Sequence, residues 1–268
     1  MARFAVNEMT TFRWTFEEDV QSYLQAGIRA LGVWRQKLSD IGEEKGAELL
    51  AESQAEVSSL SWAGGFTGSD GRSFKEAVAD AVDAVEMAGA LKASCLIIYT
   101  GARAGHTHNH ARRLVRTALS ELAEAAERQQ VTLALEPMHE GCASEWTFLT
   151  NLDDTLEVID SIKCSRLKLV LDTYHFGLDP AVVERLPELA SRIALVQLGD
   201  ARRPPQGEQD RCRLGDGEIP LPEIVRRLTR GGYDGFYELE LLGEEIESFD
   251  YRELLADSKA SFEQLHIG

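Results

Sequence analysis

The sequence predicts an α/β protein folded as a single (β/α)8 barrel over residues 1–268. Strand-like and helix-like segments alternate eight times, about 33 residues apart, and a barrel of this kind typically takes about 250 residues. No Pro- or Ser-rich linker divides the chain. An open, doubly wound parallel sheet is the alternative that this alternation leaves open.

The predicted strands are short apolar runs bounded by helical patterns, which is typical of a buried parallel sheet. Several of them end on a polar, oxygen-bearing side chain. Strands are expected within residues 4–9, 28–34, 56–62, 93–99, 131–139, 167–176, 194–200 and 236–242, and the apolar runs of 131–139 and 167–176 end on Glu136 and Asp172.

Capping residues locate the predicted helices between these strands. Thr15 can cap the first helix, with Glu18 completing a capping box, and Ser73 and Asn109 can cap the two longest. Pro222 suits the first turn of the seventh helix. Helices are expected at residues 15–27, 42–54, 73–90, 109–130, 151–162, 180–191, 222–231 and 251–266, with a long loop over 201–217.

Composition excludes several classes of function. The net charge of −17, from 45 acidic and 28 basic residues, argues against nucleic-acid binding, which needs clustered Lys and Arg. The four cysteines show no CxxC spacing, which favours free thiols. There is no secretory signal and no apolar run approaching the ~18 residues of a membrane helix. We therefore expect a cytoplasmic protein that does not contact a membrane.

Four successive strands end on oxygen-bearing side chains, namely Glu136, Asp172, Gln197 and Glu240. In a barrel the carboxyl ends of the strands form the active face. Charges at the ends of buried strands are costly unless a metal or a partner compensates them. Oxygen ligands favour Mn²⁺ or Mg²⁺, with Co²⁺ or Zn²⁺ as alternatives, so the pattern predicts one divalent metal ion.

The segments LEPMH, LDTYH, VQLGD, GDGEIPLPEIVRRL and GYDGFYELE resemble the xylose-isomerase-like TIM-barrel superfamily of sugar phosphate isomerases and epimerases. The resemblance covers most of the chain and is strongest over 131–242. Its members include sugar isomerases and epimerases, inosose isomerases and dehydratases, and hydroxypyruvate isomerase.

The resemblance implies that Glu136, Asp172, Gln197 and Glu240 bind the metal. It also implies that Glu136 and Glu240 act as catalytic bases on opposite faces of the substrate, through a metal-bound enediolate. The family usually has His at the third ligand position. Gln197 is a departure that shifts the preference toward harder ions than Zn²⁺.

The resemblance also implies substrate contacts next to the ligands. His175 would point at a substrate hydroxyl, the alternative being a hydrogen bond to Asp172. Arg203 would contact substrate oxygens, although its neighbour Arg202 leaves that assignment ambiguous. His139, three residues past Glu136, could orient Glu136 or touch the substrate, and a role in the loop alone is the equal alternative.

Other residues near the predicted strand ends have two interpretations each. Trp34 and Trp62 could wall a sugar pocket or pack in the core. Glu238 shares a strand face with Glu240 and is expected one layer deeper in the barrel. The remaining candidates are the histidines of a Gly-containing loop, where capping, substrate contact or a second metal are the alternatives: His106, His108 and His110.

The resulting prediction is a metal-dependent isomerase or epimerase acting on a small sugar or keto-polyol. A dehydratase of the dehydroshikimate or inosose type is the alternative, since it shares the first step. Endonuclease relatives and a non-catalytic binding protein are disfavoured by the charge and by the paired glutamates. No phosphate-cradling motif is present, which favours an unphosphorylated substrate. Family members are often dimers or tetramers, so a homo-oligomer stays open.

Overall fold

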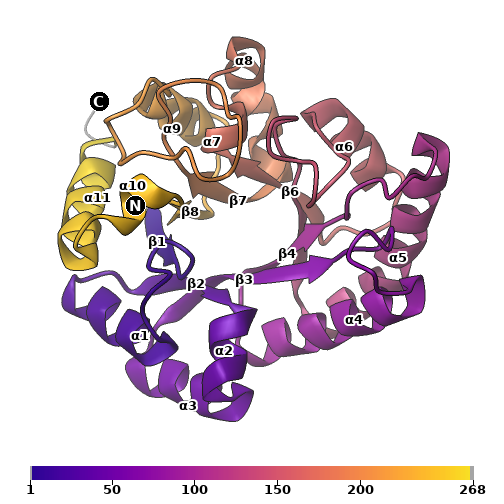
Figure 1. The fold of residues 1–268 in the computed structure, drawn as a ribbon, viewed down its shortest axis with the longest axis horizontal. Helices are drawn as coiled ribbons and strands as arrows, with labels where there is room; N and C mark the ends of the chain where they lie inside the picture. The colour runs from indigo at the N-terminus through magenta and orange to yellow at the C-terminus, as the bar shows by residue number, and fades with distance from the viewer. Residues whose placement is uncertain (1, 266–268) are drawn as a thin grey trace.

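Eight parallel strands pair in sequence order, and β1 pairs with β8, so the sheet closes into the predicted barrel (Figure 1). The computed structural model describes residues 2–265. The strands are β1 Arg3–Asn7, β2 Ala30–Trp34, β3 Glu56–Gly64, β4 Cys95–Tyr99, β5 Thr132–Leu135, β6 Leu167–Asp172, β7 Ile193–Leu198 and β8 Phe236–Leu239.

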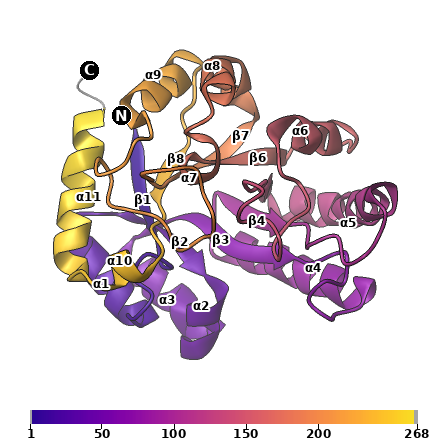
Figure 2. The same ribbon diagram turned by 45° about the horizontal axis from the view of Figure 1, so that its top comes forward.

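Helices surround the barrel, and α11 lies beside β1 and α1 where the ring closes (Figure 2). There Phe262 of α11 stacks on Phe4 of β1 with ring centroids 4.6 Å apart. Within residues 2–265 no helix is long and apolar enough to cross a membrane. The helices are α1 Phe16–Gln25, α2 Arg35–Ile41, α3 Glu43–Ser53, α4 Phe74–Ala90, α5 His108–Gln129, α6 Leu152–Asp160, α7 Thr173–Phe176, α8 Pro180–Leu189, α9 Leu221–Arg230, α10 Glu244–Glu247 and α11 Tyr251–Leu265.

Two predicted caps are confirmed and one is wrong. Thr15 and Ser73 each accept the N3 backbone N–H within a complete capping box. The cap of α5 is Thr107 rather than Asn109, because the extended backbone of Thr107 lets its hydroxyl accept from the N–H of His110. The last predicted residue of the final helix, His266, lies outside the described residues.

The sixth strand ends at Asp172, as predicted, and the carboxylate of Asp172 accepts the N–H of Tyr174 and so caps the short helix α7. The sequence analysis did not predict α7, α2 or α10, which are too short to show a helical period.

Glu238 lies inside the barrel, as predicted, below the level of the strand ends. Its carboxylate accepts hydrogen bonds from Asn7 at 2.8 Å, Ser58 at 2.5 Å and Ser59 at 2.8 Å. Burial raises the pKa of Glu238, and these donors counter that rise. A Cβ on Gly32 of β2 would lie 2.6 Å from this carboxylate, so there is no space for a side chain at position 32.

Replacing Gly32 by Ala is expected to destabilise the protein by about 1–3 kcal/mol, because the new methyl group has no room beside Glu238. The free energy of unfolding can be measured by urea denaturation. Gly207→Ala serves as the control, since nothing lies within 4 Å of a Cβ there. Equal stabilities of the two variants would show that the packing around Glu238 does not restrict position 32.

Candidate active site

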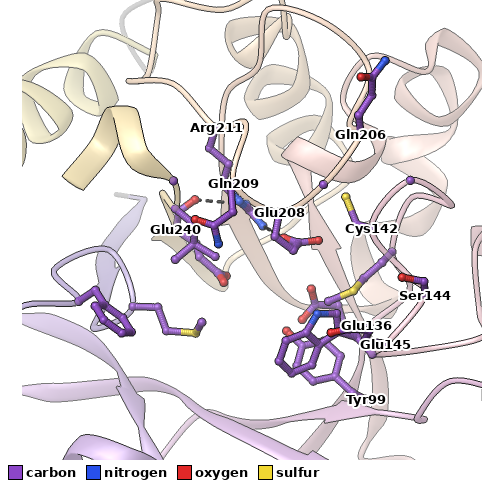
Figure 3. A pocket seen from close by; sticks show the side chains of 18 of the residues that line it. Tyr99, Glu136, Cys142, Ser144, Glu145, Gln206, Glu208, Gln209, Arg211 and Glu240 are labelled. Carbon is purple, nitrogen blue, oxygen red and sulfur yellow. Dashed lines mark hydrogen bonds and ion pairs between the residues drawn. The ribbon is translucent and has the colours of Figure 1, made fainter. Parts of the chain in front are cut away.

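The four predicted ligands meet at the carboxyl end of the barrel. Glu136 and Glu240 directly follow β5 and β8, Asp172 ends β6, and Gln197 lies on β7 in register with Asp172. All four side chains are buried. Figure 3 shows Glu240 on one side of the cavity and Glu136 on the other.

Several polar atoms of these side chains are left without partners. The amide nitrogen of Gln197 donates to Oε2 of Glu240, which leaves its oxygen Oε1 free. Within residues 2–265, Gln197 Oε1 and Glu136 Oε2 have no hydrogen-bond partner. Buried oxygens without partners are rare, and a bound cation would satisfy them.

His175, on α7, lies among the carboxylates of the strand ends. Ligand atoms of Glu136, Asp172 and His175 all lie within 4.8 Å of one another. Neither ring nitrogen of His175 has a hydrogen-bond partner in the described part of the chain. Burial lowers the pKa of His175, although Asp172 opposes the change, so its ring is neutral.

Arg211, which the sequence analysis did not single out, lines the pocket and binds a predicted ligand. Its guanidinium is 2% exposed and donates to Asp172 at 2.8 Å and to the carbonyl of Glu240 at 3.2 Å. Its other Nη donates to Glu208 at 2.9 Å. Both Glu208 and Arg211 belong to the loop over 201–217, which reaches the cavity (Figure 3).

The structure does not bring Arg203 into this cavity. Its side chain is 62% exposed and pairs with Asp210 at 3.3 Å, while Arg202 pairs with Glu245 at the surface. The six-residue spacing from Gln197 pointed to Arg203, but the loop continues before it turns inward. A spacing alone does not describe the path of a long loop.

The two predicted catalytic glutamates hold protons more strongly than free carboxyl groups. Burial raises the pKa of Glu136 well above its usual value, and Glu240 and Asp172 raise it further. Burial and Asp172 raise the pKa of Glu240 to about 8, although Arg211 counters the rise. Such shifts are typical of catalytic sites.

The cavity has a volume of about 780 Å³ and an aromatic wall. Trp62, Tyr99 and Trp146 contact one another there with ring centroids 5.1–5.8 Å apart. Trp62 therefore lines the cavity as predicted. Trp34 instead packs against Phe12 beside a separate groove.

The remaining predicted histidines lie away from the main cavity. His139 lines a neighbouring hollow, and its Nδ1 accepts the N–H of Gly141. His106 and His110 stack at 4.6 Å near the start of α5, where His108 is the first helical residue. In the described residues neither His139 nor the three histidines near the start of α5 form a group of possible metal ligands with an acid or a cysteine.

The donor set fits a divalent cation. Glu136, Asp172, Gln197 and Glu240 offer carboxylate and amide oxygens, with the His175 ring beside them. This chemistry suits Mn²⁺ or Mg²⁺ and also admits Zn²⁺.

Three curated relatives resemble parts or most of the chain. A D-psicose 3-epimerase of Enterocloster bolteae is 27% identical over 46% of this chain and 37% of its own length. An inosose isomerase of Halalkalibacterium halodurans is 27% identical over 53% of this chain and 50% of its own length. The chain thus spans half or less of these two proteins. The Escherichia coli hydroxypyruvate isomerase is 26% identical over 90% of this chain and 93% of its length.

Solved structures share the fold. Protein SMc04130 of Sinorhizobium meliloti superposes with a TM-score of 0.90 at 24% identity, over 99% of both chains. A zinc-bound IOLI protein gives 0.84 at 19% identity, over 98% of this chain and 97% of that one. The model of the xylose isomerase-like TIM barrel matches residues 20–264. The closed eight-stranded barrel and this match together show that the chain belongs to the xylose isomerase-like TIM-barrel family.

Proposed function

We propose that this protein is a divalent-metal-dependent isomerase or epimerase of a small sugar or keto-polyol. The observation that carries the proposal is the pair of buried glutamates, Glu136 and Glu240, on two sides of one cavity. Relatives named as epimerases and isomerases of sugars and related ketones support it.

The metal site would be formed by the four oxygen-bearing side chains at the strand ends. Bound Mn²⁺ or Mg²⁺ would act as a Lewis acid that polarises the substrate carbonyl and so makes the neighbouring C–H more acidic. The metal ion would be bound by the side chains of Glu136, Asp172, Gln197 and Glu240. The zinc in the IOLI structure supports a divalent ion without fixing its identity.

Glu136 and Glu240 would transfer the proton. One carboxylate removes the proton from the carbon beside the carbonyl, and the other, or the same one, returns it to the carbon skeleton. The raised pKa values suit this role, because a carboxylate that binds protons more strongly is a better base at neutral pH.

Neighbouring side chains would position the substrate. His175, neutral and without hydrogen-bond partners among residues 2–265, would contact a hydroxyl group. Trp62 would pack against the carbon face of the ring or chain. Of the residues first expected to bind substrate, Trp62 lines the cavity, whereas His139, His175, Trp34 and Arg203 do not. His175 lies next to Glu208 of the lining, with 3.5 Å between its Nε2 and Oε1 of Glu208. We assign the role first expected of Arg203 to Arg211.

Glu136→Gln and Glu240→Gln are each expected to slow substrate proton exchange about 10²–10⁴-fold, because the amide cannot accept the proton. Deuterium incorporation from D2O, followed by NMR with a panel of ketoses and inososes, measures this. Glu245→Gln, a surface carboxylate, is the control. Full exchange in both pocket variants would contradict the base roles, and a product lighter by one water would identify a dehydratase instead.

Mn²⁺ should stabilise chelator-treated protein, by about 2.7 kcal/mol at a concentration of 100 times Kd. Asp172→Asn should weaken this stabilisation, since a neutral amide is a poorer ligand. Thermal unfolding and bound-metal analysis are the measurements, with Asp153→Asn on the surface as the control. Unchanged Mn²⁺ binding in Asp172→Asn would contradict the ligand assignment.

The metal-free protein should lose stability as the pH rises from about 4.5 to about 8. Over this range the Glu240 carboxyl ionises in the unfolded chain but stays protonated in the folded one, so the folded state binds more protons. One such group lowers the free energy of unfolding by at most about 1.4 kcal/mol per pH unit. Urea denaturation of chelated protein measures the slope. An equally steep slope in Glu240→Gln would contradict this origin.

A further inference from the structure

The cavity wall is strongly acidic, and its cations are already paired. Arg211 is held by Asp172 and Glu208, and Arg13 lies 3.1 Å from Glu247. In the described residues, the two guanidiniums of the lining face five carboxylates: Glu136, Glu145, Glu208, Glu240 and Glu247. The two charges of a divalent ion would still leave the negative charges in excess.

Glu208 occupies the position that an anionic substrate group would need. Its Oε2 accepts from Arg211 at 2.9 Å, and its Oε1 lies 3.5 Å from Nε2 of His175. The hydroxyl of Tyr174 donates to the carbonyl of Gly207, which fixes the loop next to Glu208. Although burial opposes ionisation, the Arg211 guanidinium lowers the pKa of Glu208, so this carboxylate is charged at neutral pH.

Three of the five N–H groups of Arg211 already donate to Asp172, to the carbonyl of Glu240 and to Glu208, and Nε is buried without a partner in residues 2–265. A carboxylate or phosphate is normally bound by two parallel N–H donors of an arginine. Because Asp172 and Glu208 already take donors from both Nη atoms, an anionic substrate group would have to compete with them for Arg211. The wall of Trp62, Tyr99 and Trp146 is uncharged and suits the C–H face of a sugar.

The substrates named for the relatives differ in charge. Psicose and inosose are uncharged, whereas hydroxypyruvate carries a carboxylate, and the hydroxypyruvate isomerase has the longest match. Overall similarity therefore leaves the substrate charge open. The charges that line the cavity decide it.

We propose that the cavity selects uncharged ketoses or cyclic keto-polyols over anionic keto acids and sugar phosphates, and that Glu208 enforces this selection by occupying Arg211. This inference rests on the proposed function. It adds a specificity-determining residue from the loop over 201–217 to the chemistry of the strand ends.

The test compares matched pairs on Mn²⁺-loaded protein. Deuterium incorporation gives kcat/KM for D-fructose against D-fructose 6-phosphate, and for dihydroxyacetone against hydroxypyruvate. We expect the uncharged member of each pair to react at least about tenfold better. Faster reaction of either anionic member than of its uncharged counterpart would overturn the inference while leaving the isomerase function intact.

Glu208→Gln tests the residue itself. It removes one negative charge and releases Arg211, so the preference for the uncharged member should shrink about tenfold, through a lower KM for the anionic one. Glu245→Gln removes a charge paired with Arg202 outside the cavity and should leave the preference unchanged. An unchanged preference in Glu208→Gln would overturn the role of Glu208.

If no member of the panel exchanges a proton, the proposed function fails. The charge preference is then decided by binding of the same pairs, followed by tryptophan fluorescence, because Trp62 and Trp146 line the cavity. Tighter binding of the anionic members would overturn the inference as well.

Discussion

The buried ion pair between Arg211 and Asp172 is the constraint on which the arrangement of the site depends. A guanidinium with 2% exposure is costly to bury, and it is tolerated here because carboxylates and a backbone carbonyl receive its donors. The same arginine orients the carboxylate of Asp172 and, through its bond to Glu208, anchors the loop over 201–217. Charge balance, loop position and the orientation of a proposed metal ligand therefore depend on one side chain.

Below the strand ends, a second carboxyl group, that of Glu238, is buried and is stabilised in a different way. Among residues 2–265, Glu238 forms no ion pair and is held instead by hydroxyl and amide donors. Neutral donors suit a carboxyl group whose pKa burial raises. The two glutamates therefore have different roles: Glu238, in β8, fills the barrel, and Glu240, just past the end of β8, faces the cavity.

The barrel and the candidate ligands could be predicted from the sequence because a buried strand is recognisable from a short stretch of consecutive residues. Apolar runs that end on Glu136, Asp172 and Glu240 show both the strand and the side chain at its mouth. Loop residues carry no such signal. Arg211 and Arg203 share a charged, Pro-containing loop, and only the folded path shows that Arg211 enters the cavity while Arg203 stays in solvent. The error at Asn109 was also local, since Thr107 caps equally well by type.

This division between strands and loop has a consequence for how such a barrel changes its substrate. The strand ends hold the groups that would bind a cation and move a proton, and these are fixed by the closed sheet. Glu208 comes from a long loop, where substitution costs little folding energy. A substitution at a loop carboxylate such as Glu208, which pairs with Arg211, would therefore change the charge of the preferred substrate. It would leave the groups proposed to transfer the proton in place. Under the proposed selection, the partner of one buried arginine is thus a better guide to substrate charge than overall similarity to relatives named for charged and uncharged ketones.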